Sequence, residues 1–286
     1  MADTRFFEIV QRYQAGDVQG AAVLAAQSAD PFHQLIATYL QRVSAQGADD
    51  IYATPAGFTA FIRGGGNVPL YANLSHALRS IYEQHDTVRL LDIGVGDGLA
   101  LLPALTDRDR IQQIDLVEPA ADMLATTAAA LQESQIAHTV TNESAETFIT
   151  HADSQYDIAQ ATFCLHNLAA DTRRNVFEWL RRHCQTFLLA EFDVQFVGDV
   201  GSAEHVDYLA ERYRNGIAEY DADSPAVQQF LLPILFRNFD AGAGVQMHET
   251  TIDQWRSELT AAGFTAVQSK LLYRYWWADA CLLIAT

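Results

Sequence analysis

Three glycines at alternate positions follow an apolar run that ends in an acidic residue. Residues 90–98 read LLDIGVGDG, so that Asp92 precedes Gly94, Gly96 and Gly98. Glycine has no Cβ atom, which allows a sharp backbone turn and lets a ligand lie against the main chain. We expect a helix to begin at residue 99, and its first N–H groups would be free to bind that ligand. The segment therefore predicts a ligand-binding turn between a strand and a helix.

The spacing of these glycines differs from that of the dinucleotide-binding fingerprint. That fingerprint is Gly-x-Gly-x-x-Gly, whereas Gly98 follows Gly96 by only two residues. A carboxylate at Asp92 would repel a pyrophosphate and would favour a cationic ligand. The pattern therefore argues against a nicotinamide-dependent oxidoreductase.

A second acidic residue, Glu118, lies where a ribose could be bound. It ends the apolar run 111–118 and follows Gly98 by 20 residues. A carboxylate at the end of the second strand can accept hydrogen bonds from both hydroxyls of a ribose. Together, the glycine turn and Glu118 predict a site for an adenosine-containing ligand.

The elements that must position these residues alternate between strands and helices from Val88 onward. Near-continuous apolar strands are typical of a parallel sheet that is buried on both faces. Right-handed crossovers make such a sheet doubly wound, so we predict a doubly wound α/β fold. The expected strands are 88–93, 111–118, 137–141, 156–162 and 186–192, and the expected helices between them are 99–105, 121–132 and 172–183.

The end of the chain predicts a helix and two further strands. Thr251 and Gln254 form a capping-box pair that would open a helix, and Gly263 would close it. The apolar runs 266–273 and 280–285 are joined by a short connection, so they would pair as an antiparallel hairpin. The complete sheet would then be mixed, with seven strands of which the last is antiparallel.

Helical spacing of apolar residues also marks the beginning of the chain and one long insertion. Residues 1–45 and 71–84 predict helices, and a loop containing Pro55, Gly57 and three consecutive glycines is expected between them. The predicted domains are an N-terminal helical substrate or lid segment over 1–85 and a Rossmann-like domain over 86–286, with a helical lid insertion at about 194–249.

The composition excludes several classes of partner. The chain has 286 residues and a formal net charge of −18, and Lys270 is its single lysine. Nucleic-acid binding normally needs a basic face, so no nucleic-acid partner is expected; the arginine pairs at 173–174 and 181–182 look like a solvated helix face. No stretch reaches the roughly 20 uncharged apolar residues of a membrane span.

The cysteines and the N-terminus indicate a cytoplasmic protein. Cys164, Cys184 and Cys281 are widely separated, which favours reduced, buried thiols. The N-terminal residues lack the continuous apolar stretch of a secretory signal. The histidines and carboxylates have no metal-ligand spacing, so we expect no metal site.

Residues 88–192 resemble the core of the class I S-adenosylmethionine-dependent methyltransferases of the small-molecule type. The Asp92–Gly98 turn is similar to the first motif of that family, and Glu118–Leu124 is similar to the second. The antiparallel strand predicted at the end of the sheet is also a feature of the family.

Two further segments resemble the family less specifically. Residues 142–146 align with its third motif, where an acidic residue usually lies near the adenine amino group; this chain has Ser144 there and Glu143 one step away. Residues 160–168 resemble the strand end and loop that close over the methionine moiety.

The resemblance implies S-adenosyl-L-methionine as cofactor and S-adenosyl-L-homocysteine as product. It implies that the three glycines line the methionine and ribose portions, that Glu118 holds the ribose, and that the Ala145 backbone meets the adenine. Arg63 and Tyr71, upstream of the core, are candidates for the cofactor carboxylate. The expected cofactor-binding residues are Arg63, Tyr71, Asp92, Gly94, Gly96, Gly98, Glu118, Pro119, Met123, Ser144, Ala145, Thr162 and Phe163.

Methyl transfer needs few catalytic groups. The reaction is an in-line displacement at an activated carbon, so a dry pocket that aligns the nucleophile lowers much of the barrier. A base is needed when the acceptor arrives protonated, as a hydroxyl does. His166 follows the fourth strand and is the expected catalytic residue, although a histidine there could instead pack or cap the loop. Glu191 and Asp193 form a second acidic pair near the same rim.

The N-terminal helices and the insertion would form the acceptor pocket. Aromatic residues of the insertion and the last hairpin suit an organic metabolite of moderate size, although they could equally form the core of a lid. The expected substrate contacts are Asp193, His205 and Phe236.

Three functions are compatible with these observations. The first is methyl transfer to an oxygen or nitrogen of a small organic metabolite. The second is methylation of a protein or carrier-bound substrate, which would need an open acidic groove. The third is a non-catalytic cofactor-binding protein of the same fold, against which the glycines and Glu118 argue. A homodimer is compatible with the family, but no heptad or apolar stripe indicates one.

Overall fold

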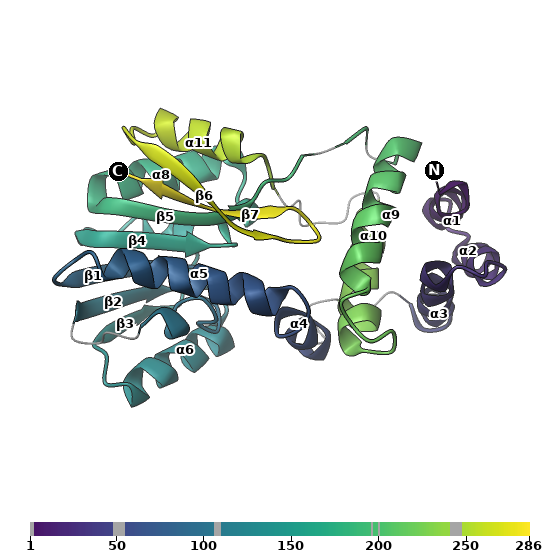
Figure 1. Cartoon of the computed structure of the whole chain (residues 1–286), viewed down its shortest axis with the longest axis horizontal. Coiled ribbons are helices and arrows are strands. Elements are labelled where there is room, and N and C mark those ends of the chain that lie inside the picture. The colour runs from purple at the N-terminus through teal and green to yellow at the C-terminus, as the bar shows by residue number, and fades with distance from the viewer. Residues whose placement is uncertain (1–2, 48–54, 106–109, 196, 200, 241–247) are drawn as a thin grey trace. The chain divides into compact units, whose positions relative to one another are not determined.

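A computed structural model of the chain describes residues 3–47, 55–105, 110–195, 197–199, 201–240 and 248–286. Its internal contacts divide the chain into two compact units, which are described in turn (Figure 1). The sheet unit comprises Pro69–Gln195 and Gln246–Thr286, and the helical unit comprises Met1–Val68 and Phe196–Val245.

This division differs from the predicted boundary after residue 85. Most of the helix α5 (Asn67–Tyr82) belongs to the sheet unit. Its side chains bind the sheet unit: Ser75 Oγ donates to Ala100 O over 2.8 Å, and the Tyr82 hydroxyl donates to Gln160. The predicted insertion corresponds closely to Phe196–Val245, which groups with the N-terminal helices rather than with the sheet.

The sheet unit is built on seven strands in the order β3-β2-β1-β4-β5-β7-β6. The first five strands are parallel, whereas β7 runs antiparallel to both β5 and β6. The predicted doubly wound mixed sheet with a terminal antiparallel hairpin is therefore confirmed. The strands are β1 (Val88–Ile93), β2 (Ile111–Val117), β3 (His138–Thr141), β4 (Tyr156–Thr162), β5 (Cys184–Phe192), β6 (Val267–Arg274) and β7 (Asp279–Ala285).

Helices cover the two faces of this sheet. The α-helices of the unit are α5, α6 (Ala121–Glu133), α7 (Ala145–Phe148), α8 (Ala170–His183) and α11 (Ile252–Ala261), and the 3-10 helices include η1 (Leu102–Ala104) and η3 (Leu165–Asn167). Leu91 and Ile93 of β1 join Phe177 of α8 and Trp255 of α11 in one hydrophobic cluster. α5 crosses the opposite face (Figure 1), so the parallel strands are buried on both sides.

One prediction for this unit was wrong, and one short helix was not predicted. Residues 99–105 form turns and the short η1 instead of an α-helix. Pro103 explains the difference, because it has no N–H to donate to the carbonyl of Leu99 in a helix that begins at Leu99. The short helix α7 was not predicted from the sequence.

The predicted limits of the α11 helix are confirmed. The Thr251 side chain accepts a hydrogen bond from Gln254 N over 3.2 Å, and Gly263 adopts a φ of 102° just beyond the helix. The Gln254 side chain donates to Glu258, so the capping box is half formed.

Four described helices of the helical unit begin on a polar side chain that accepts a hydrogen bond. Asp3, Asp17, Asp30 and Ser202 accept hydrogen bonds from the first turns of α1, α2, α3 and α9, which satisfies backbone N–H groups that a helix leaves free. The elements are α1 (Thr4–Gln14), α2 (Val18–Ala26), α3 (Pro31–Gln46), α4 (Pro55–Ile62), α9 (Ala203–Ile217), the π-helix η4 (Val227–Leu231) and α10 (Leu232–Arg237).

The helix α4 lies in a segment that the sequence predicts as a loop. A Cβ atom at Gly57 would lie 2.8 Å from Cβ of Gln229 in η4. The glycine that indicated a loop therefore allows two helical segments to pack closely.

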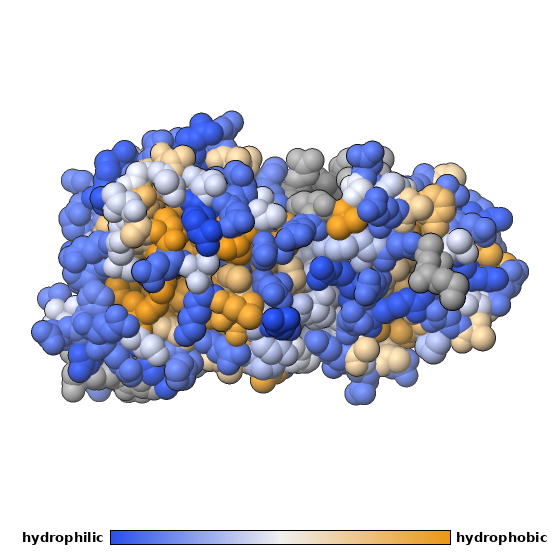
Figure 2. All heavy atoms as spheres, turned by 45° about the horizontal axis from the view of Figure 1, so that its top comes forward, coloured by the Kyte–Doolittle hydropathy of each residue, from blue (hydrophilic) through white to orange (hydrophobic). Residues whose placement is uncertain are grey.

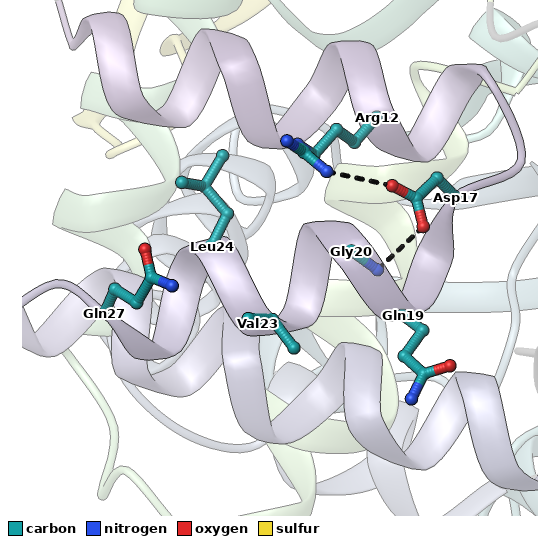
Figure 3. Close-up of a pocket in the computed structure, with 7 residues that line it drawn as sticks. All are labelled: Arg12, Asp17, Gln19, Gly20, Val23, Leu24 and Gln27. Atoms are coloured by element: carbon teal, nitrogen blue, oxygen red, sulfur yellow. Dashed lines mark hydrogen bonds and ion pairs between the residues drawn. The ribbon is translucent and has the colours of Figure 1, made fainter.

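One face of the molecule is mostly polar (Figure 2). Hydrophilic side chains cover most of the face in Figure 2, in line with the 36 acidic residues of the chain. An open groove of about 360 Å³ lies along α1 and α2, where an ion pair of 3.0 Å joins Arg12 and Asp17 (Figure 3). None of the predicted site residues lines this groove. Among the described helices, none has the length and hydrophobicity required to cross a membrane.

Candidate active site

The glycine turn after β1 has the backbone conformation that its sequence predicts. Gly94, Gly96 and Gly98 have φ values of 70°, 56° and 76°, a region that residues with a side chain rarely adopt. Gly94 N donates to Val117 O over 2.7 Å, and Gly96 O accepts from the Thr127 hydroxyl over 2.8 Å. These bonds tie the turn to β2 and α6.

Gly94 and Gly96 differ in the space around them. A Cβ atom at Gly94 would lie 2.5 Å from Sγ of Cys164, whereas one at Gly96 would meet only Sδ of Met123, at 4.0 Å. Gly94 is therefore required for packing, and Gly96 borders open space that a ligand can occupy.

Replacement of Gly94 by alanine is expected to lower the free energy of unfolding by about 2–4 kcal/mol, because it combines backbone strain with a steric clash. Denaturant unfolding of the purified chain measures this change. Gly47→Ala is the matched control, since Gly47 has a φ of 85° and no heavy atom within 4 Å of its Cβ position. Equal losses in the two variants would contradict the proposed clash with Cys164.

Glu118 connects the end of β2 to the glycine turn. Its Oε2 accepts from Gly96 N over 3.0 Å, and its Oε1 accepts from Ala120 N over 2.9 Å. The side chain is 8% exposed. Each carboxylate oxygen has a second lone pair, so Glu118 can accept hydrogen bonds from two ligand hydroxyls while it holds the turn.

Asp92 is buried beneath the turn. Gln160 Nε2 donates to its Oδ2 over 2.6 Å, and the Tyr82 hydroxyl in turn donates to Gln160. Burial raises the pKa of Asp92 to about 8. Oδ1 is buried without a hydrogen-bond partner among the described residues. A positive charge held in the turn would favour the ionised form of this carboxyl.

The segment after β3 contacts the loop after β2. Asn142 Nδ2 donates to the carbonyls of Glu118 and Pro119, at 2.8 and 2.9 Å. Ser144 precedes α7, and Ala145 is buried as its first residue. Glu143, the nearest acidic residue, forms an ion pair with His151 over 2.7 Å. These contacts bring the second and third predicted motifs together.

Aromatic rings gather where β4 and β5 end. Phe163, directly after Thr162, has an unusual φ of 52°. Its ring stacks on Phe192, with centroids 4.7 Å apart, and meets the edge of Tyr71 at 5.9 Å. A strained backbone that presents an aromatic ring at a strand end is typical of a functional site.

His166 of η3 and Glu191 near the end of β5 form a buried pair. Nδ1 of His166 lies 2.9 Å from Oε2 of Glu191, and the two side chains are 11% and 1% exposed. The other carboxylate oxygen accepts from Leu165 N and His166 N, at 3.0 and 3.2 Å. If Nδ1 donates to Glu191, Nε2 is the nitrogen that can take a proton.

A second carboxylate, Glu249, acts on His166 through its charge. Trp277 Nε1 donates to Glu249 Oε1 over 3.0 Å. Burial opposes protonation of His166, but the charge and hydrogen bond of Glu191 and the charge of Glu249 outweigh it and raise its pKa. Burial and the charge of Glu191 likewise raise the pKa of Glu249.

Comparison with solved structures places this architecture among known folds. Magnesium protoporphyrin IX methyltransferase from Synechocystis PCC 6803, solved with bound SAH, is 11% identical, with a TM-score of 0.51 over 78% of this chain and 90% of that one. The same enzyme with bound SAM is 12% identical, with a TM-score of 0.50 over 91% and 98%. At this identity the likeness establishes the fold. No curated protein matches the chain.

The sequence also matches a family model. Residues 90–186 fit the model described as a methyltransferase domain. The chain carries a methyltransferase domain with the class I fold. The prediction of an S-adenosylmethionine-dependent methyltransferase is therefore confirmed, and with it the expected enzyme class and cofactor.

Four predicted site residues are not among the groups just described. Asp193 Oδ1 accepts from Ile252 N over 2.9 Å and so holds the start of α11. Arg63 is exposed beyond α4, His205 is buried in the first turn of α9, and both belong to the helical unit. Phe236 is fully buried against Tyr13 and Tyr39, so it is part of the core of that unit and not of an acceptor surface.

One group in the described residues has the arrangement of a metal site. Asp3, Asp30 and His33 bring their ligand atoms within 4.8 Å of one another. Arg214 forms ion pairs with both carboxylates, and its hydrogen bond lowers the pKa of Asp30. The group is therefore an ion-pair network that joins α1, α3 and α9.

The methyltransferase is expected to gain activity as the pH rises through a value above the usual histidine pKa of about 6.5. His166, the predicted base, must be unprotonated to act, and Glu191 and Glu249 raise the pH at which it loses its proton. Glu249→Gln removes one of these charges, so its acidic limb should lie at lower pH. The pH dependence of kcat, measured for the wild type and for Glu249→Gln, gives the position of the acidic limb in each. An unchanged limb in the variant would contradict the assignment of His166 as the base.

The sequence indicated some of these residues but not their partners. The sequence indicated Glu191 only as a carboxylate at the rim of the sheet. Its contact with His166 could not be predicted, because the two residues are 25 positions apart in the chain. Glu249 carried no signal at all, since it lies next to a capping box and 83 residues beyond His166. Cys164 could have been noticed as the residue that faces Gly94 only after the strand order was known.

Proposed function

We propose that the methyltransferase transfers a methyl group to a hydroxyl oxygen of a small organic molecule, with His166 as the base. The observation that supports this proposal most directly is the buried pair of His166 and Glu191 at the carboxyl edge of the sheet. Transfer to an unprotonated amine needs no such base, whereas a hydroxyl must lose its proton.

The residues around the glycine turn fit the cofactor. Gly96 borders open space, Glu118 has lone pairs for two hydroxyls, and the buried Asp92 carboxyl beneath the turn would ionise more readily beside a bound cation. When bound, S-adenosylmethionine supplies an electrophilic methyl group. Met123, Pro119, Ser144 and Ala145 would border the nucleoside, while Tyr71, Thr162 and Phe163 would border the methionine portion.

His166 performs the acid–base work in this proposal. When the cofactor is bound, Nε2 would accept the hydroxyl proton of the acceptor, and the ring would hold this proton until it passes to solvent. Glu191 fixes the ring orientation through Nδ1 and stabilises the positive charge that forms. The negative charge of Glu249 also favours the protonated ring.

The charge of the chain supports a small acceptor over a nucleic acid. A net charge of −18 with one lysine opposes binding of a polyanion. The aromatic rings of Phe163, Phe192 and Tyr71 suit an organic acceptor. The three unpaired cysteines agree with a cytoplasmic location.

The test uses matched acceptors that differ only in the nucleophile. The full chain is incubated with methyl-labelled S-adenosylmethionine and pairs of small molecules that carry a hydroxyl or an amine at one position. We expect label on the hydroxyl compounds, with one S-adenosylhomocysteine formed for each methyl transferred. Transfer only to amines, or only to added protein or RNA, would overturn the proposal.

A further inference from the structure

Arg173 differs from the exposed arginines that surround it in the sequence. The sequence predicted a solvated basic face for α8, and Arg174 and Arg182 are indeed exposed. Arg173 is only 3% exposed. Its guanidinium binds both oxygens of Glu258, at 2.9 and 3.0 Å, and lies 4.3 Å from the ring centroid of Trp255.

The remaining bonds of Arg173 reach the two segments that carry the acid–base groups. Nη1 donates to Leu168 O over 2.9 Å and to His248 O over 2.8 Å. Leu168 follows His166 by two residues, and His248 directly precedes Glu249. His248 N also donates to His166 O, over 2.6 Å. One buried nitrogen therefore connects two segments that are 80 residues apart in the chain.

We propose that Arg173 is a positioning residue that fixes Glu249 relative to His166 by binding the backbone on both sides. The proposal rests on the function of His166 proposed above. In the described part of the chain, the hydrogen bonds of Arg173 go to Glu258 and to two backbone carbonyls, so it acts through the two backbone segments that it joins.

Arginine is suited to this role and lysine is not. Its planar fork makes four hydrogen bonds here, two to Glu258 and two to the carbonyls. A lysine has three donors on one atom and cannot reach both sides of such a fork. We call Arg173 and its bonds to the carbonyls of Leu168 and His248 the clamp. Glu258 balances the guanidinium charge, so the clamp adds little net charge near His166.

The charges that act on His166 come from three different elements. Glu191 on β5 and Glu249 before α11 raise its pKa, while Arg173 on α8 lowers it. The thiol of Cys164, on the same loop, and the hydroxyl of Tyr71, on α5, both interact with Glu191. Loss of the clamp would change the effect of Glu249 on the pKa of His166. Loss of the Arg173 charge would raise that pKa, in the same direction as the charge of Glu191 does.

The pKa of His166 can be measured on the unliganded full chain by NMR of labelled histidines, with the His166 signal identified by its loss in His166→Gln. We expect a higher pKa for His166 in Arg173→Met than in the wild type. We also expect kcat to fall about tenfold or more, while KM for the acceptor and Kd for S-adenosylmethionine change less than about twofold. Arg174→Met is the control on the same helix and should change none of these values.

Two further variants separate position from charge. Arg173→Lys keeps the charge but loses the fork, so kcat should fall about tenfold. Glu258→Gln keeps both carbonyl bonds of Arg173 but leaves its charge unbalanced, so the pKa of His166 should fall while kcat at high pH stays within about threefold. These variants also carry the test if Arg173→Met does not fold.

A wild-type kcat and a wild-type His166 pKa in a folded Arg173→Lys or Arg173→Met variant would overturn the proposal. Failure of the proposed function gives a different result, because His166→Gln would then retain activity whatever the Arg173 variants do. The NMR measurement does not depend on catalysis, so it reports on the clamp in either case.

Discussion

Replacement of His166 by alanine is expected to lower kcat for methylation of a hydroxyl by about 10²–10⁴-fold, the usual contribution of a general base. The Kd for S-adenosylmethionine should change little, because the glycine turn and Glu118 make no hydrogen bond to His166 in the described structure. Single-turnover kinetics at saturating cofactor, together with calorimetric titration, measure the two quantities separately.

Glu191→Gln is the matched control for this loss. The amide can still accept from the Leu165 and His166 N–H groups, but it cannot stabilise a protonated ring. We expect an intermediate loss in kcat and a His166 pKa below that of the wild type. If methyl transfer in His166→Ala continued at the wild-type rate, a role as base would be excluded.

The second large effect concerns cofactor binding. Glu118→Ala should weaken binding of S-adenosylmethionine and S-adenosylhomocysteine by about 10–100-fold, because two hydrogen bonds to a charged acceptor are lost. Gly96→Leu should weaken it at least as much, since the new side chain would occupy the open space beside Met123. Calorimetric titration of each variant measures the Kd.

Matched variants separate loss of the site from loss of the fold. Glu118→Gln retains one carbonyl acceptor and should bind more tightly than Glu118→Ala. Gly16→Leu carries similar backbone strain, with a φ of 80° and no heavy atom within 4 Å, but lies in the helical unit. Wild-type affinity in Gly96→Leu, or an equal loss in Gly16→Leu, would contradict the proposed place of the cofactor.

The sequence predicted the sheet well because its signals are local. Apolar runs of strand length alternate with helical stretches, and each such run from β1 to β7 is a strand in the structure. The glycine turn was equally readable, since a positive φ at Gly94, Gly96 and Gly98 is a property of the residue type. The main local failure was the helix after the turn, where Pro103 outweighed an apolar pattern.

Contacts between distant segments could not be predicted in the same way. The sequence predicted an exposed position for Arg173, because no neighbouring residue indicates its contacts with Glu258 and Trp255. Gly57 is a residue type that favours loops, and only its close contact with η4 explains why it lies in a helix. Glu249 became a candidate only when the fold brought it close to His166.

The place of β7 has a consequence for synthesis of the protein on the ribosome. β7 lies between β5 and β6, yet its first residue, Asp279, follows the end of β5 by 87 residues. In a nascent chain that has completed β5, this strand therefore has β4 as its neighbour but lacks β7 until the intervening residues have been synthesised. During this interval β5 is an open edge, and two unfinished chains on one messenger could pair along it.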